Sequence, residues 1–238
     1  MATLLKDQDP LGAAAYKYWS SKEECFIDVH SDLCEMDHIP ASYLFREFKE
    51  MPKIEKKALK QCKGKILDIG AGVGSHSLYL QNKGLDITAL EISPFCVDIM
   101  KDRGIDNIVF GDFNEIKVEK YDTLLLLMNG IGICGQINNL ALFLTRCKQF
   151  LNDGGELLLD SSDLSYMYEG EDEAFMPSHY IGEVRYTMGF EDVTGPAFDW
   201  LFIDFDKLKE EAVKCGFTCE KIINGPHYDY LARLKAAK

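Results

Sequence analysis

The stretch that most constrains the fold runs from residue 65 to residue 80 and reads KILDIGAGVGSHSLYL. It opens with a short apolar run around Asp68, which is typical of a buried parallel strand. Glycines then alternate at Gly70, Gly72 and Gly74, and apolar residues resume in a helical stretch. Glycine lacks a Cβ, and the first N–H groups of a helix have no partner within it. This order therefore predicts a ligand at the helix N-terminus.

The spacing of these glycines distinguishes between ligands. A dinucleotide fingerprint requires glycine at the first, third and sixth positions, whereas here the sixth is Ser75 and the last glycine comes one place early. An NAD-linked oxidoreductase would need that missing glycine. The pattern Asp-x-Gly-x-Gly-x-Gly instead resembles motif I of the class I S-adenosylmethionine (SAM) methyltransferases. The resemblance implies that SAM lies across the loop, with its amino end near the acid of the motif; the residues concerned are Asp68, Gly70, Ala71, Gly72 and Gly74.

The second predicted strand, residues 86–90, ends in Glu91, about twenty residues beyond the first glycine. That is the length of one strand–helix–strand unit, and an acid there can accept hydrogen bonds from both ribose hydroxyls. A helix begins at Pro94, because proline suits the first turn and Ser93 can cap it. Ile92, beside the acid, is expected to contact the cofactor.

Two further strands extend the resemblance, which covers residues 64 to about 159. Strand 107–110 leads to Asp112 and Phe113, where in the family an Asp takes the adenine amino group and its neighbour packs on the ring. Strand 122–127 ends in Met128 and Asn129, where motif IV of the family would lie, and both are expected at the cofactor.

The resemblance predicts an α/β fold with a Rossmann-like seven-stranded sheet in the order 3-2-1-4-5-7-6, the last strand antiparallel. The remaining strands are expected at 156–160, 217–223 and 228–234, with a last helix that Asp206 caps and that ends at Cys215. We divide the chain into an N-terminal helical cap, residues 1–62, and a SAM-binding domain, residues 63–238. An insertion at about 164–205 interrupts the second domain.

The cap is predicted to contain helices at 13–19, at 23–36 and from 43 to about 52. It either folds over the cofactor pocket or forms a plain helical layer on the sheet. The insertion is predicted to be a β-hairpin with strands at 183–190 and 200–203. It either extends the sheet or meets a second subunit in a homodimer.

The composition limits the kinds of partner that this protein can be expected to bind. The formal net charge of −13 argues against nucleic acid. The basic run of lysines between 53 and 65 is interrupted by Glu50 and Glu55 and is interpreted as the solvated face of a helix. The longest apolar run, residues 124–128, is too short to span a bilayer, and the N-terminus lacks a signal-peptide pattern, so we expect a cytosolic protein. The eight scattered cysteines predict free thiols.

The predicted catalytic residues are Asn129, which could orient the acceptor, and Asp160, at the carboxyl end of the fifth strand. The residues after strand four are neither the motif of the amino-DNA methyltransferases nor the strand-end Asp of the magnesium-dependent catechol type. Asp160 and Asp163, a pair near the fifth strand, could hold an amine and Arg46 a carboxylate, although a surface salt bridge or a helix cap is the favoured explanation for each.

His30, Cys34 and His38 would share a helix face if a helix continued past Met36, but Pro40 argues against that, and no metal is expected. The sequence thus predicts a SAM-dependent methyltransferase acting on a small molecule. The alternative is a SAM- or nucleotide-binding protein without transfer activity.

Overall fold

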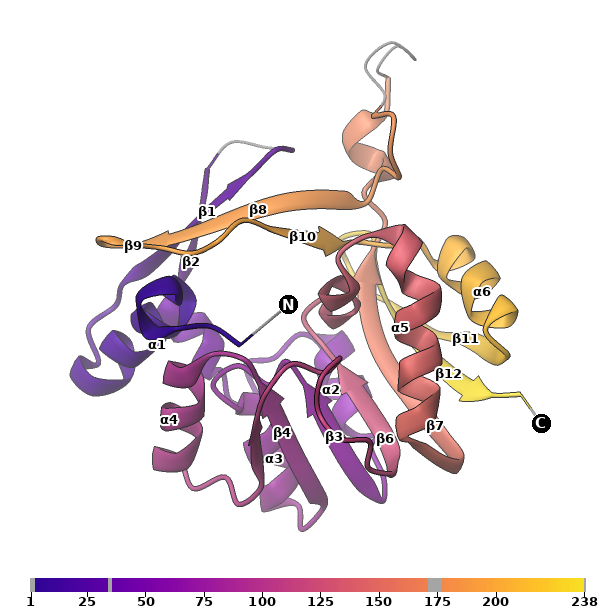
Figure 1. Cartoon of the computed structure of the whole chain (residues 1–238), viewed down its shortest axis with the longest axis horizontal. Helices are drawn as coiled ribbons and strands as arrows, with labels where there is room; N and C mark the ends of the chain where they lie inside the picture. The colour runs from indigo at the N-terminus through magenta and orange to yellow at the C-terminus, as the bar shows by residue number, and fades with distance from the viewer. Residues whose placement is uncertain (1–2, 34–35, 171–176, 238) are drawn as a thin grey trace. The chain divides into compact units, whose positions relative to one another are not determined.

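The computed structural model describes residues 3–33, 36–170 and 177–237 of the 238-residue chain (Figure 1). The chain packs into two compact units, each assembled from separate segments. The first unit comprises Met1–Pro52, Lys63–Lys117 and Arg185–Phe198, and the second comprises Lys53–Cys62, Val118–Val184 and Asp199–Lys238. The division into residues 1–62 and 63–238 stays a prediction about domains, because packing units need not coincide with domains.

Three parallel strands form the centre of the first unit: β3 (Lys65–Ile69), β4 (Asp86–Glu91) and β5 (Ile108–Phe110). They alternate with α3 (Ser75–Asn82) and α4 (Pro94–Asp102). β3 and β4 are almost wholly buried, as their continuous apolar runs require. Ser93 caps α4 by accepting a hydrogen bond from the N–H of Cys96, as predicted.

The N-terminal segment of this unit is only partly helical. It contains η1 (Lys6–Gln8), α1 (Pro10–Ser21), β1 (Phe26–Ser31), β2 (Asp37–Pro40) and η2 (Ala41–Phe45). The helix predicted at 13–19 is confirmed within α1. The helix predicted over 23–36 is wrong, because β1 occupies its centre and buries Ile27 and Val29 on one face. The helix predicted from 43 is also wrong, since only a 3₁₀ turn ends there.

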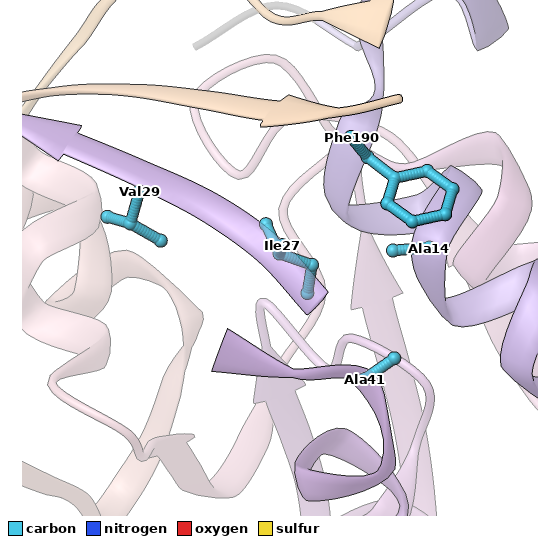
Figure 2. Packing of buried hydrophobic residues seen from close by; sticks show 5 residues of the cluster. All are labelled: Ala14, Ile27, Val29, Ala41 and Phe190. Carbon is cyan, nitrogen blue, oxygen red and sulfur yellow. The ribbon is translucent and has the colours of Figure 1, made fainter. Parts of the chain in front are cut away.

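A small core shows how the strands of this segment are held. Ile27 and Val29 of β1 pack with Ala14 of α1, Ala41 and Phe190 (Figure 2). Phe190 ends β8 (Glu183–Phe190), which confirms the first predicted hairpin strand. This contact brings the insertion onto the N-terminal segment.

The hairpin of the insertion turns back through β9 (Val193–Thr194), which pairs with β8. β8 does not extend the larger sheet; it pairs antiparallel with β1, with Met188 opposite Val29. The smaller sheet has the order β10-β8-β1-β2, with β9 also paired to β8. β10 (Phe198–Leu201) begins two residues before the predicted strand 200–203.

The second unit contains α2 (Lys53–Leu59), β6 (Tyr121–Leu126), η3 (Gly130–Cys134), α5 (Ile137–Phe150), β7 (Leu151–Ser162), η4 (Ser165–Tyr168), α6 (Phe205–Lys214), β11 (Phe217–Asn224) and β12 (Asp229–Ala236). β6 runs parallel to β7, whereas β12 is antiparallel to both β7 and β11. Helices α5 and α6 lie side by side (Figure 1). The N-cap of α6 is Asp204, not the predicted Asp206, because the Asp204 carboxylate accepts the N–H of Lys207 at 2.8 Å.

The larger sheet has seven strands in the order β11-β12-β7-β6-β3-β4-β5. Numbered along the chain and read from β5, this is the predicted order 3-2-1-4-5-7-6 with its last strand antiparallel. The fold class is therefore confirmed. Among the described residues, no helix combines the length and apolar character needed to cross a membrane.

Candidate functional site

The loop between β3 and α3 is shaped by three glycines in the left-handed region, with φ of 76° at Gly70, 56° at Gly72 and 80° at Gly74. A Cβ at Gly74 would lie 2.2 Å from Cδ1 of Ile105, so packing requires glycine there. A Cβ at Gly72 would meet no heavy atom within 4 Å. The backbone at Gly72 therefore has open space beside it, as close approach of a ligand requires.

The N-terminus of α3 follows directly. Its N-cap is Gly74, and no side chain caps its first N–H groups. The neighbouring Ser75 donates instead to the carbonyl oxygen of Leu44 at 2.7 Å. Such N–H groups favour an anionic or polar ligand group in front of the helix.

Asp68 lies in β3, two residues before Gly70, and is buried, with 2% of its surface exposed. Its carboxylate accepts a hydrogen bond from Oγ of Ser77 at 2.7 Å and so ties β3 to α3. Burial raises the pKa of Asp68, and the nearby His76 and the Ser77 hydroxyl partly offset the rise. The role expected of Asp68 at the amino end of SAM stays a prediction beside this observed structural one.

Glu91, at the end of β4, has a fixed carboxylate. One oxygen accepts the N–H of Gly72 at 2.6 Å, and the other accepts those of Ile92 at 2.7 Å and Ser93 at 2.8 Å. Burial raises the pKa of Glu91, and these three donors oppose the rise. A carboxylate offers about four acceptor positions, so capacity for a further donor remains. The predicted ribose acid and the predicted loop are thus hydrogen-bonded to each other.

Asp112 and Phe113 follow β5 and are both buried. Asp112 accepts the N–H of Asn114 at 2.7 Å, and its carbonyl oxygen accepts those of Glu115 and Ile116, which forms a tight turn. The N–H of Gly111 donates to the carbonyl oxygen of Glu91. The ends of β4 and β5 are therefore joined, and the predicted cofactor residues from Asp68 to Phe113 all lie in the first unit.

The predicted residues of the second unit gather around Asn129. Met128 and Asn129 have φ of 60° and 56°, which is uncommon away from glycine and concentrates at functional sites. The N–H of Asn129 donates to Asp160 at 3.0 Å, and its side-chain amide contacts Ser161 at 2.7 Å and the carbonyl oxygen of Leu201 at 3.1 Å. These contacts orient Asn129 and leave one amide N–H for a ligand.

The other polar candidates have local partners. Asp163 accepts the N–H of Ser165, and Arg46 donates to the carbonyl oxygen of Tyr43 with its guanidinium 3.5 Å from that ring. His38 pairs with Asp28 across β1 and β2 at 2.8 Å, and Cys34 lies outside the described residues. Within the described part of the chain, no group of three His, Cys, Asp or Glu side chains could hold a metal ion.

Sequence reasoning missed three residues that contact predicted site residues or their neighbours. Arg103 donates to the carbonyl oxygen of Val73 at 2.7 Å, and Ser161 holds Asn129. Asp9 caps α1 and accepts a hydrogen bond from Ser93. Only Asp9 had a signal in the sequence, since an Asp directly before a proline marks a helix start.

Several known proteins are similar to this chain in sequence or in structure. A protein-family profile described as "Methyltransferase domain" matches residues 36–221. The crystal structure of a SAM-dependent methyltransferase from Bacteroides fragilis, in complex with S-adenosyl-L-homocysteine (SAH), is similar over 99% of this chain and 98% of that chain, with 42% identity and a TM-score of 0.93.

More distant similarities concern the fold or a part of the chain. The sugar N-methyltransferase KedS8 from Streptoalloteichus matches 82% of this chain and 88% of its own at a TM-score of 0.55, but only 14% identity. A curated 23S rRNA (uracil-C5)-methyltransferase from Pyrococcus horikoshii is 30% identical over 82 residues. That match spans 32% of this chain and only 20% of the rRNA methyltransferase.

Proposed function

The chain belongs to the SAM-dependent methyltransferases, and from that premise we propose that it transfers the methyl group of SAM to a small-molecule acceptor. The observation that carries the choice of acceptor is the formal net charge of −13, which opposes the approach of a phosphate backbone. The similarity to an rRNA methyltransferase covers too little of either protein to outweigh this charge.

The residues of the first unit fit the cofactor. Gly72 has open space beside its backbone, the N-terminus of α3 has no side-chain cap, and Glu91 is fixed at the strand end with acceptor capacity remaining. We assign the loop from Gly70 to Gly74 to the methionine part, Glu91 to the ribose, and Asp112 and Phe113 to the adenine. When bound, SAM supplies an electrophilic methyl group on a sulfonium.

The chain's own contribution is to position the acceptor and exclude water, because such an electrophile needs little covalent help. We assign Asn129 to orienting the acceptor through its remaining amide N–H, and Asp160 to holding the Asn129 backbone. Neither assignment requires a general base. Asp160 is thus proposed as a support for Asn129 and not as a proton acceptor.

Production of SAH, measured with pooled candidate acceptors, tests this proposal. Separate pools of small amines, carboxylic acids, phenols and hydroxyl compounds are each incubated with SAM and the full-length protein. Ribosomal RNA and tRNA are tested alongside them. We expect SAH to accumulate with one small-molecule pool and not with RNA, and methylation of RNA would overturn the assignment. SAM binding without turnover in any pool would instead favour the alternative of a binding protein.

The homodimer predicted through the insertion also stays a proposal. β8 already pairs with β1, so a contact by strand addition would have to use an end of the smaller sheet, at β2 or β10. The hairpin therefore serves first to hold the N-terminal strands of its own chain.

A further inference from the structure

A series of hydrogen bonds connects the first turn of α1 with the end of β4. Asp9, the N-cap of α1, has only 1% of its surface exposed. One carboxylate oxygen accepts the N–H of Gly12 at 2.9 Å. The other accepts a hydrogen bond from Oγ of Ser93 at 2.5 Å. Asp9 thus caps its own helix and also contacts the residue that caps α4.

Ser93 passes this contact on to Glu91. Its N–H donates to one Glu91 oxygen at 2.8 Å, and the other Glu91 oxygen accepts the N–H of Gly72 at 2.6 Å. Three successive hydrogen bonds therefore lead from Asp9 through Ser93 and Glu91 to the glycine loop. All four residues belong to the first unit.

Close packing leaves little freedom in this arrangement. A Cβ at Gly12 would lie 2.4 Å from Oγ of Ser93, so α1 approaches Ser93 as closely as its backbone permits. The N–H of Leu4 donates to the carbonyl oxygen of Ile92 at 3.1 Å, and the rings of Tyr16 and Phe95 lie 5.5 Å apart. The N-terminal segment is therefore fitted to the residues that follow Glu91.

We propose that Asp9 is a positioning residue for the cofactor: it fixes Ser93, and through Ser93 it holds the Glu91 carboxylate in the orientation that accepts a ribose hydroxyl. This inference rests on the ribose role proposed for Glu91. It extends that role to the N-terminal segment, where the sequence motifs of the cofactor site do not reach.

The Asp9 carboxyl group also influences the charge of Glu91. Burial is the main cause that raises the pKa of Asp9 and that of Glu91, and the Asp9 charge raises the pKa of Glu91 further. The other titratable group that faces Glu91 is the Cys96 thiol of α4. β5 places Phe110 opposite Glu91, and the glycine loop contributes only an N–H. Removing the Asp9 charge therefore lowers the pKa of Glu91.

Calorimetric titration of SAH between pH 4.5 and 8 tests the proposal on Asp9→Asn, Asp9→Ala and Lys6→Ala. Asn can keep the helix cap through its one amide oxygen, but it removes the charge and the second oxygen that accepts from Ser93. SAH affinity should fall at acid pH as Glu91 is protonated, and we expect the midpoint of that fall to move to lower pH in Asp9→Asn. Asp9→Ala, which loses the link to Ser93, should raise the Kd about tenfold at pH 7.

Lys6→Ala is the matched control, because Lys6 lies in the same segment but pairs with the exposed Asp98. It should bind SAH like the wild type. An unmoved acid midpoint in Asp9→Asn, or a Kd within about twofold of wild type in a folded Asp9→Ala, overturns the proposal. Glu91→Gln tests the ribose role of Glu91 separately from the positioning role of Asp9. Wild-type SAH binding by that variant would remove Glu91 from the ribose site, whatever the Asp9 variants do.

Discussion

Gly72 and Gly74 lie two residues apart in the loop after β3, and both have positive φ, but only Gly74 has neighbours where a side chain would go. For Gly74→Ala we expect the free energy of unfolding to fall by about 2–3 kcal/mol, since the left-handed backbone and overpacking against Ile105 both contribute. For Gly72→Ala we expect a loss of about 1 kcal/mol, from the backbone alone, together with weakened SAH binding.

Urea denaturation measures the first effect and calorimetry with SAH the second. The two variants are matched controls, because each adds one methyl group to the same loop. Equal stability losses in the two would contradict the packing role of Gly74. Undiminished SAH affinity in Gly72→Ala would show that the open side of the loop does not face the ligand.

Asp68 gives a prediction about pH. Its native pKa lies above its ordinary value because it is buried. The folded protein therefore binds this proton more tightly than the unfolded chain does. The contribution to stability is complete below the ordinary pKa of about 4 and is lost as the pH rises through the raised native pKa.

Asp68→Asn removes this titration but can keep an acceptor for Ser77. Relative to the wild type, the variant should thus gain stability as the pH rises through that window. Urea denaturation at several pH values from 4 to 8 compares the two proteins, and the difference cancels the self-repulsion of the other acidic groups. A difference that does not vary with pH would show that Asp68 is not buried as a charged group at neutral pH.

At the scale of residues, the sequence is informative where spacing carries the information. One strand–helix–strand unit fixes the distance between the glycines and Glu91, and in the structure Glu91 accepts the N–H of Gly72. The hydrogen bond between Asp9 and Ser93 joins positions 84 residues apart, and no local pattern reports such a contact. Asn129 was expected at the site, but the contacts that orient it, from Ser161 and Leu201, depend on tertiary structure.

At the scale of elements, α6 offers a direct test of which acid begins the helix. Asp204 accepts the N–H of Lys207 and also the hydroxyl of Tyr180 at 2.6 Å, whereas Asp206 lies in the first turn. Asp204→Ala should lower the free energy of unfolding by about 1–2 kcal/mol. Asp206→Ala should change it by only about 0.5 kcal/mol. Urea denaturation of both variants distinguishes them, and a larger loss in Asp206→Ala would restore the cap predicted from sequence.

The elements of the parallel sheet are predicted correctly, because buried strands and capped helices alternate there. The N-terminal strands were mistaken for a helix because Phe26, Ile27, Val29 and Leu33 also fit a near-helical spacing. A short apolar stretch is ambiguous between the two periods. In the structure this stretch forms a strand because it pairs with β8, more than 150 residues later in the sequence.

On the scale of the whole molecule, fold class and family follow from motif order, whereas the packing of the N-terminal segment does not. The sequence suggests a cap followed by a domain. In the structure, Ala15 and Trp19 of the N-terminal segment pack with Val73 of the glycine loop and with α4. Such packing depends on which surfaces meet after folding, and the chain carries no linker-like stretch to signal it.

Because segments of the two units alternate along the chain, the order of synthesis and any truncation affect both units. The backbone passes from one to the other after residues 52, 62, 117, 184 and 198. Neither unit is formed by one continuous stretch of the chain. On the ribosome the nascent chain must emerge past residue 198 before the first unit has all its segments, and by then most of the second has also been synthesised. Truncation should therefore yield an incompletely folded product, and a split version of the protein would need both pieces to be produced together.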